Sequence, residues 1–508
     1  MVAKESNLRL VIAGLMLGIL MAAMDNTIVA TSIGTIVSDL GGLDKFVWVT
    51  SAYMVAVMAG MPIFGKLSDM YGRKRFYIFG LLIFLIGSAL CGTAQSIVQL
   101  SIYRAIQGIG GGALMPIAFT IVFDIFPIEK RGKMTGLLGA VFGSSSVLGP
   151  LLGAYITENI SWHWIFYVNI PIGLMSLIFI LKAYKENNPP TKQNIDWWGA
   201  ITLVIAVISL MFALELGGKE FKWDSIQIIG VFASFIVFFV GFLLVERKVK
   251  DPIISFWMFK RKEFAISQII TFFYGATFVI LTVFIPIFVQ AVYGGSATNA
   301  GLILTPMMLG SVVGSAIGGI FQTKISYRNL MLLSVISFGI GMYLLGTMDP
   351  QTSRVLLTIY MIITGFGVGF SFSLLPTVSI HNMEPRFRGS ATSTNSFFRS
   401  LGMTIGVTIF GSIQNSAFTA NLKDAFKGIE HGSSMLNNLG DPSTIFRSDV
   451  RSSIPTFILE KIIAAMSSSI TTVFLLALIP ITVSFIAILF MGNVKAGTKN
   501  NDKVNVKS

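Results

Sequence analysis

Long apolar segments alternate with short polar connections along almost the whole chain. Six apolar segments come first, then a pair, then six more, near residues 10–36, 47–64, 76–94, 98–125, 134–156, 164–181, 198–216, 226–245, 264–292, 300–321, 330–347, 355–380, 391–413 and 470–491. A helix needs roughly 20 apolar residues to cross a hydrocarbon core of about 30 Å. The pattern therefore predicts fourteen membrane-spanning helices.

The composition supports this interpretation. Charged residues make up only 12% of the 508 residues, hydrophobic residues make up 54%, and the mean hydropathy is +0.76. Soluble domains carry about 25% charged residues. We therefore expect an all-α polytopic membrane protein embedded in the lipid bilayer. Its single cysteine, Cys91, excludes an intramolecular disulfide.

The positive charge is unevenly distributed between the connections. The formal net charge is +13, and if the amino terminus is cytoplasmic, most of the 37 Lys and Arg residues fall on the cytoplasmic side. Cytoplasmic loops of membrane proteins carry such an excess. The pattern predicts a multi-pass protein with both termini in the cytoplasm. The charge is then a topology signal, and we expect no nucleic-acid partner.

Small residues and one Arg-Gly pair recur at an offset of 257 residues. The matched positions are Gly108 and Gly365, Gly110 and Gly367, Gly112 and Gly369, Arg131-Gly132 and Arg388-Gly389, and Gly149 and Gly406. This repeat predicts two related six-helix bundles with two helices inserted between them. The predicted units are a first bundle (8–186), the inserted pair (195–247), five helices of the second bundle (263–415), a long outer loop (416–469), the last helix (470–491) and a cytoplasmic tail (492–508).

Two charged residues lie inside the predicted first bundle. Asp25 lies about 22 Å along the first helix, and Arg104 lies in the outer half of the fourth, so the two side chains can pair. A carboxylate at this depth lines a cavity, pairs with a cation or is protonated, and each state suits a proton-exchanging site. The alternatives are a hydrogen bond between helices for Asp25 and an arginine that reaches the outer interface. Neighbouring Asn26 and Gln107 are expected to line the same cavity.

A charged turn separates the second and third apolar segments. It reads Gly65-Lys-Leu-Ser-Asp69-Met-Tyr-Gly72-Arg73-Lys74-Arg75. It resembles the signature loop of the major facilitator superfamily, with Met70 in place of the usual arginine. The resemblance implies the major facilitator fold.

Further segments resemble the fourteen-span drug:proton antiporters of that superfamily. They are Asp25-Asn-Thr-Ile-Val, Arg104-Ala-Ile-Gln107-Gly108, Gly149-Pro150-Leu-Leu-Gly153, and Trp162-His-Trp164-Ile-Phe166 with Asn169 and Pro171. The third is similar to an exporter motif, and its glycines and proline predict either a rocking interface or simply a packed kink.

The resemblance also implies roles for several charges. It associates Arg104 with proton transfer through a neighbouring acid. It implies that Arg73 bridges to Asp124 and that Asp69 faces a helix end of the opposite bundle. Together with Gly65, Gly72 and Lys74, these residues would form a latch that differs between conformations. The equivalent loop of the second bundle has Gln322 in place of the acid, so the predicted latch is one-sided.

The second bundle contains Arg399, flanked by Asn395, but no deep acidic residue. Arg399 either reaches towards the interface or lines the cavity with Asn395. Drug:proton antiporters that export dicationic compounds often have extra acids in the membrane, so the resemblance argues against dicationic substrates here. The sequence has no phosphate-binding loop and no zinc-protease motif, and its three histidines are scattered. We therefore expect no enzyme activity, no metal and no cofactor other than protons as the coupling ion.

The resemblance is closest to Bacillus-type multidrug exporters and covers nearly the whole chain. It implies a bacterial plasma-membrane antiporter that expels amphipathic toxic compounds, antibiotics included, in exchange for protons, by alternating access and as a monomer. Two alternatives remain open: an exporter dedicated to one metabolite or lipid, and a membrane sensor on the same fold that does not transport.

Overall fold

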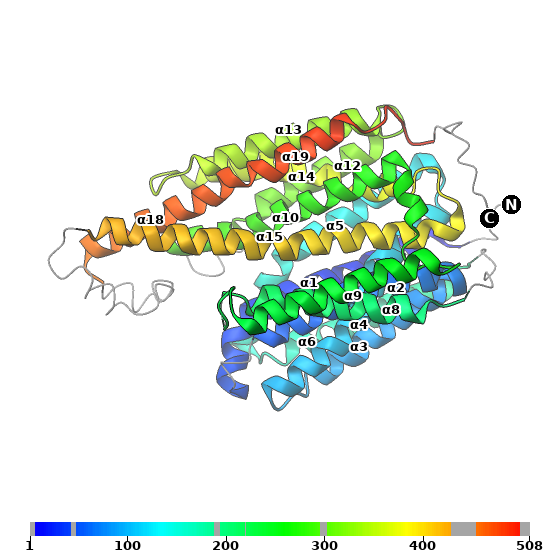
Figure 1. Cartoon of the computed structure of the whole chain (residues 1–508), viewed down its shortest axis with the longest axis horizontal. Coiled ribbons are helices and arrows are strands. Elements are labelled where there is room, and N and C mark those ends of the chain that lie inside the picture. Colours follow the sequence, from blue (N-terminus) through cyan, green and yellow to red (C-terminus); the bar gives the residue numbers. More distant parts are fainter. Residues whose placement is uncertain are drawn as a thin grey trace.

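The computed structural model describes residues 6–41, 47–186, 194–218, 220–294, 302–427 and 454–497, and these are almost entirely helical. The helices are α1 (Leu8–Leu40), α2 (Val47–Tyr71), α3 (Arg73–Cys91), α4 (Ile97–Ile125), α5 (Ile128–Asn159), α6 (Trp164–Tyr167), α7 (Asn169–Ala183), α8 (Trp197–Leu216), α9 (Ile226–Lys248), η1 (Phe256–Lys260), α10 (Lys262–Ala291), α12 (Thr305–Phe321), α13 (Tyr327–Gly346), α14 (Arg354–Ser379), η2 (Pro385–Phe387), α15 (Arg388–Ala425), α18 (Thr456–Leu476) and α19 (Leu478–Leu489). Figure 1 shows them running roughly parallel to one long axis.

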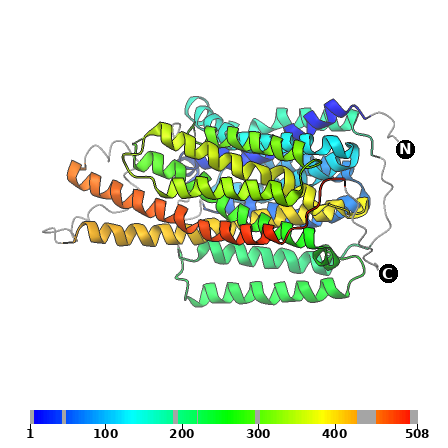
Figure 2. The same cartoon turned by 90° about the horizontal axis from the view of Figure 1, so that it is seen from above.

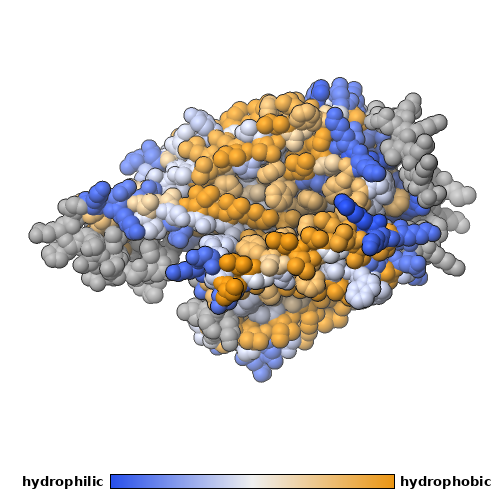
Figure 3. Space-filling view, viewed as in Figure 1, coloured by the Kyte–Doolittle hydropathy of each residue, from blue (hydrophilic) through white to orange (hydrophobic). Residues whose placement is uncertain are grey.

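The helices agree with the predicted spans. Among the described residues, thirteen helical segments are long and apolar enough to cross a membrane, and Thr305–Phe321 is a shorter apolar helix. Figure 3 shows hydrophobic side chains along the flank of the molecule and hydrophilic side chains gathered near its two ends. This distribution fits a protein surrounded by hydrocarbon.

The segment 416–469, predicted as a long outer loop, is helical at both of its ends. Helix α15 continues to Ala425 and α18 begins at Thr456, and both project beyond the other helices (Figures 1 and 2). Buried apolar residues from both helices, Phe418 and Leu422 with Ile462, belong to the core of the second bundle and explain the extension. The remainder, 428–453, and the tail residues 498–508 lie outside the described part.

The sequence repeat recurs in the packing of the helices. A Cβ atom on Gly110 of α4 would lie 2.4 Å from the amide nitrogen of Phe84 on α3, and one on Gly367 of α14 would lie 2.3 Å from that of Phe338 on α13. Each glycine thus lets a backbone approach that any side chain would prevent. Helices α3 and α4 therefore correspond to α13 and α14.

Two matched glycine contacts also join the bundles. A Cβ atom on Gly132 of α5 would lie 1.7 Å from the carbonyl oxygen of Gly319 on α12, and one on Gly389 of α15 would lie 2.6 Å from that of Gly65 on α2. Both crossings lie at the same end of the molecule as the first and last described residues. The N–H of Ala496 donates to the carbonyl oxygen of Gln322, close to Gly319, and the Ser6 hydroxyl donates to that of Lys185, next to Glu186. We call this end, on the right in Figure 1, the termini end. The structure is therefore closed at the termini end.

The inserted helices α8 and α9 form a hairpin beside one of these crossings. Leu203 and Val207 of α8 share a buried apolar cluster with Met61 of α2 and Phe397 of α15. In Figure 2 the hairpin lies along one side of the molecule, next to α15. It covers the contact between α2 and α15 and leaves most of α9 exposed.

We predict that Gly132→Val opens the termini end. The added side chain must displace the backbone of α12, and overpacking typically costs about 1–3 kcal/mol, which shifts a two-state equilibrium by roughly tenfold. The hydroxyl groups of Thr120 and Thr392 lie 2.7 Å apart across the bundles. Cysteines at these two positions, in a Cys91→Ser background, should cross-link in the parent chain and much less in the Gly132→Val variant.

Gly411→Val is the matched control, because a Cβ atom on Gly411 meets nothing within 4 Å. It should leave the cross-linking yield unchanged. If the Gly132→Val variant cross-links with the same yield as the parent chain, the close approach of α5 and α12 does not hold this end closed.

Candidate functional site

The first bundle encloses an ion pair between Asp25 on α1 and Arg104 on α4. Both side chains are fully buried, and Nη1 of Arg104 donates to Oδ2 of Asp25. The Nε atom of Arg104 donates to the carbonyl oxygen of Val49 at 3.2 Å, and the guanidinium lies 4.1 Å from the ring centroid of Tyr53. The pairing expected from the sequence is present.

Two side-chain amides complete the coordination of Asp25. The Nδ2 atom of Asn169 and the Nε2 atom of Gln107 donate to Oδ1 of Asp25 at 2.9 and 2.8 Å. Both amides also donate to the hydroxyl of Ser88, at 3.0 and 3.2 Å. The side chain of Asn26 lies outside the described part.

Asn169 had no role in the sequence analysis beyond a family pattern. It is the first residue of α7, directly after the break that separates α6 from α7, and it is fully buried. An amide in an apolar segment was the available signal, since buried polar groups need partners. The sequence alone did not reveal that its partner is Asp25.

The described partners of the Asp25 carboxyl group all donate hydrogen bonds to it. They are one guanidinium and two side-chain amides. Separating a buried ion pair costs about 3–5 kcal/mol because each charge is left without its partner. The pair of Asp25 and Arg104 therefore holds α1 and α4 together in this conformation.

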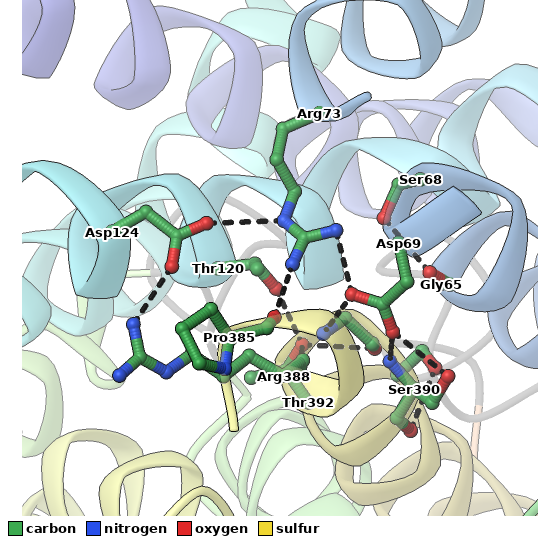
Figure 4. A network of polar contacts seen from close by, with 12 residues as sticks. Gly65, Ser68, Asp69, Arg73, Thr120, Asp124, Pro385, Arg388, Ser390 and Thr392 are labelled. Atoms are coloured by element: carbon green, nitrogen blue, oxygen red, sulfur yellow. Dashed lines mark hydrogen bonds and ion pairs between the residues drawn. The ribbon is translucent and has the colours of Figure 1, made fainter. Parts of the chain in front are cut away.

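A second charged cluster joins the two bundles at the termini end (Figure 4). Asp69 of α2 accepts hydrogen bonds from the backbone N–H groups of Gly389 and Ser390 at 2.8 and 2.7 Å, and from the Ser390 hydroxyl at 2.9 Å. These are the first amides of α15, where a helix favours a negative charge. Asp69 therefore binds the opposite bundle by its helix N-terminus, as the resemblance implied.

Arg73 connects both acids of this cluster. It pairs with Asp69 at 2.6 Å and with Asp124 of α4 at 3.2 Å, and it donates to the carbonyl oxygen of Pro385 at 2.7 Å (Figure 4). Asp124 also pairs with Arg388 of the second bundle at 2.9 Å. We call Asp69, Arg73, Asp124 and Arg388 the latch.

Lys74 differs from its predicted place. Its ammonium donates to the carbonyl oxygens of Leu181 and Tyr184 at 2.9 and 2.5 Å, both at the end of α7. It therefore ties helices of the first bundle together and does not bridge the bundles. The reason is its orientation: Lys74 follows Arg73 directly, and successive helical residues point in different directions.

Glu186 was missed by the sequence analysis. Its carboxylate accepts hydrogen bonds from the backbone N–H groups of Arg73 and Lys74 and so caps the start of α3. The preceding Gly72, with φ of 111°, adopts a conformation that side chains rarely allow and has no capping side chain of its own. Burial raises the pKa of the Glu186 carboxyl.

The opposite crossing, between α5 and α12, lacks the acid. Gln322 is fully buried there and donates to the carbonyl oxygen of Gly319 at 3.1 Å. Because an amide carries no charge, the ionic contact is confined to the α2–α15 side. The one-sided latch expected from the sequence matches this geometry.

The Gly149-Pro150-Gly153 segment lies inside the first bundle. A Cβ atom on Gly149 would lie 1.9 Å from the Thr27 hydroxyl, and one on Gly153 would lie 2.7 Å from the carbonyl oxygen of Ile28. Pro150 is internal to α5. This motif therefore sets the contact of α5 with α1, close to Asp25, and not a contact between bundles.

The predicted polar residues of the second bundle are enclosed. Asn395 donates to the Thr271 hydroxyl at 2.7 Å, and Arg399 donates to the Ser371 hydroxyl at 3.4 Å and to its carbonyl oxygen at 3.2 Å. Within the described residues, no group of three or more His, Cys, Asp or Glu side chains has the arrangement of a metal site.

Two related helical bundles with paired charges between their helices define a polytopic membrane protein of the transporter class. A family model described as Major Facilitator Superfamily matches residues 15–407. The chain belongs to the Major Facilitator Superfamily, which confirms the expected family.

Curated relatives extend this finding. The chain is 67% identical over 498 residues to "Multidrug resistance protein 3" of Bacillus subtilis (strain 168), covering 98% of this chain and 97% of the relative. It is 35% identical over 518 residues to "Multidrug transporter protein MdtP" of the same organism, covering 98% and 95%. The solved proton:xylose symporter XylE has a TM-score of 0.62 at 14% identity, with 97% of this chain and 98% of that chain covered. This last likeness shows the fold alone.

We predict that Asp69→Asn weakens closure of the termini end. Hydrogen bonds to a charged group are worth about 1.5–3 kcal/mol, so loss of the charge shifts the conformational equilibrium by roughly tenfold. Lys182 and Lys324 are exposed positions at this end of the two bundles. Spin labels there should report a longer mean distance in the variant, measured by double electron–electron resonance.

Glu129→Gln is the control, because Glu129 is an exposed acid at the same end and joins no ion pair among the described contacts. It should leave the distance distribution unchanged. An unchanged distribution in Asp69→Asn as well would remove the latch from the closing contacts.

Proposed function

We propose that this protein exports amphipathic small molecules across the bacterial plasma membrane in exchange for protons, by alternating access. The observation that carries this proposal is the fully buried cluster of Asp25, Arg104, Gln107 and Asn169 within one of the two bundles. An ionisable group at membrane depth is a functional site by default. The curated relatives named as multidrug proteins supply the substrate class.

The cycle follows from the two charged clusters. The termini end faces the cytoplasm, in keeping with the positive charge of its connections. In the conformation described, that end is closed by the latch, so the opposite end is the one from which a proton enters. Protonation neutralises Asp25 and releases Arg104, which changes the packing of α1 against its neighbours. Opening of the termini end then lets the proton leave to the cytoplasm and the drug bind.

The latch acts through its difference between the two conformations. Asp69, Arg73 and Arg388 have partners across the bundles only while the termini end is closed. A ligand or proton moves a two-state equilibrium only by its differential affinity for the two states. The latch therefore biases the resting protein towards the outward-facing conformation, and drug binding must overcome that bias.

One chain carries all the parts of this mechanism. Both bundles, the crossings between them, the buried ion pair and the latch belong to the same polypeptide. We therefore propose that the monomer is the transporting unit, because no element of the cycle needs a second copy.

Asp25→Asn should abolish transport against a gradient. Asparagine has nearly the same shape but no titratable proton, so the exchange loses its coupling ion while the fold keeps most of its hydrogen bonds. The measurement is uptake of rhodamine 123 into inside-out proteoliposomes under an imposed proton gradient, with proton release followed by a pH-sensitive dye.

Asp39→Asn is the matched control on the same helix. Asp39 is exposed near the end of α1, where it accepts a hydrogen bond from Trp162 at 2.8 Å. This variant should transport like the parent. A sensor would bind the dye without any flux, and an exporter dedicated to a metabolite or lipid would leave it outside. Full uphill transport by Asp25→Asn would place the coupling elsewhere and end the proposal.

A further inference from the structure

The second bundle buries a cation that has no carboxylate partner. Arg399 of α15 is 6% exposed, and no ion pair involves it among the described residues. Its hydrogen bonds go to the hydroxyl and the carbonyl oxygen of Ser371, at 3.4 and 3.2 Å, and its guanidinium lies 4.9 Å from the ring centroid of Phe372. The acidic residues described in this bundle lie at helix ends or in connections.

Arg399 differs in this respect from the buried arginine of the first bundle. Arg104 has Asp25 as an ionic partner, so the charge enclosed there sums to zero. Arg399 keeps a full uncompensated charge in an apolar region, where neutral partners replace only part of its hydration. The transport cycle proposed above makes no use of it.

The position of Arg399 is at the contact between the bundles. Its aromatic neighbour Phe372 packs against Phe142 of α5, with ring centroids 5.5 Å apart. The next residue, Ser400, contacts the sulfur atom of Met61 on α2 at 3.8 Å. Helices α2 and α5 of the first bundle therefore both come close to this part of the second bundle.

The internal repeat relates Arg399 to a residue of the first bundle. Subtracting the offset of 257 residues maps Arg399 of α15 onto Phe142 of α5. Equivalent positions of the two bundles thus meet around one ring, that of Phe372. In one bundle the position is apolar and in the other it is cationic, so an amphipathic molecule between the bundles finds both kinds of contact.

We infer that Arg399 is the recognition site for an anionic group, a carboxylate above all, on the amphipathic molecules that this protein exports. This inference rests on the proposed export function and specifies its substrate class. A guanidinium is suited to carboxylates because its planar N–H groups match the two oxygen atoms. Phe372 and Phe142 supply the aromatic surface for the apolar part of the same molecule.

The affinity of Arg399 for an anionic group differs between the two conformations of the cycle. In the closed structure the ring of Phe372 covers the guanidinium, and Phe142 packs against that ring. Opening of the termini end separates α5 from α14 and uncovers Arg399 for a molecule that arrives from the cytoplasm. Closure restores the aromatic contact and expels the carboxylate towards the other side. The anionic group is thereby bound in one state and released in the other.

The test uses two dyes that differ only at the carboxylate. Rhodamine 110 carries the free acid, and rhodamine 123 is its methyl ester. In proteoliposomes with the full chain, the parent should transport both. Arg399→Gln should lower transport of rhodamine 110 relative to rhodamine 123 by about tenfold or more, as expected for loss of a hydrogen bond to a charged group.

Arg399→Lys and Arg354→Gln are the controls. The first keeps a positive charge and should retain most of the rhodamine 110 transport. Arg354→Gln removes an exposed cation at the start of α14 and should leave the transport of both dyes unchanged. Transport of the ester by Arg399→Gln demonstrates that this variant folds and cycles.

The outcomes separate this inference from the function on which it rests. An equal effect of Arg399→Gln on both dyes, or no effect on either, would overturn carboxylate recognition. So would a parent protein that transports the ester but excludes the acid. Loss of uphill ester transport in Asp25→Asn tests only the proton coupling and is independent of the comparison between the two dyes.

Discussion

The dominant constraint on this protein is that every charge within the hydrocarbon layer needs a partner. The chain meets this constraint in three ways. Asp25 and Arg104 pair inside one bundle, while Asp69 pairs with Arg73 in the same bundle and binds the N-terminus of α15 in the opposite bundle. Among the described residues, the polar and aromatic partners of the Arg399 guanidinium are Ser371 and the ring of Phe372. The Asp25–Arg104 pair is stable in one arrangement, and the latch depends on the conformation. The charge of Arg399 is compensated only when an external anion binds.

Close backbone contacts determine where the bundles meet. Glycines at equivalent positions, Gly132 with Gly319 and Gly389 with Gly65, let the helices cross without intervening side chains. The two crossings are alike in shape but not in charge, because Gln322 takes the place of Asp69 on one side. The inserted hairpin of α8 and α9 covers the charged crossing. It thereby shields the α2–α15 contact from lipid, which gives the extra helices a structural role on one side of the molecule.

Much of this arrangement was predictable from the sequence, for definable reasons. Helix positions follow from apolar length, and the partner of Asp25 follows because few charges lie at that depth. The capping of α3 by Glu186 was not predictable, since it joins residues more than a hundred positions apart through backbone groups. The same is true of Asn169, whose role depends on the break before α7. The length of α15 and α18 was underestimated because their mutual packing, not membrane depth, extends them.

The buried pair and the crossing between bundles are connected through one helix. Asp25 lies two residues from Thr27, whose hydroxyl contacts α5 at Gly149 and donates to the carbonyl oxygen of Ser145 at 3.3 Å. The same α5 carries Gly132 at the crossing with α12 and Phe142 against Phe372. In the proposed cycle, a rearrangement of α1 on protonation would therefore displace the helix that closes the termini end. Because α5 is a continuous helix between these contacts, a small shift at Asp25 reaches both the crossing and the ring over Arg399.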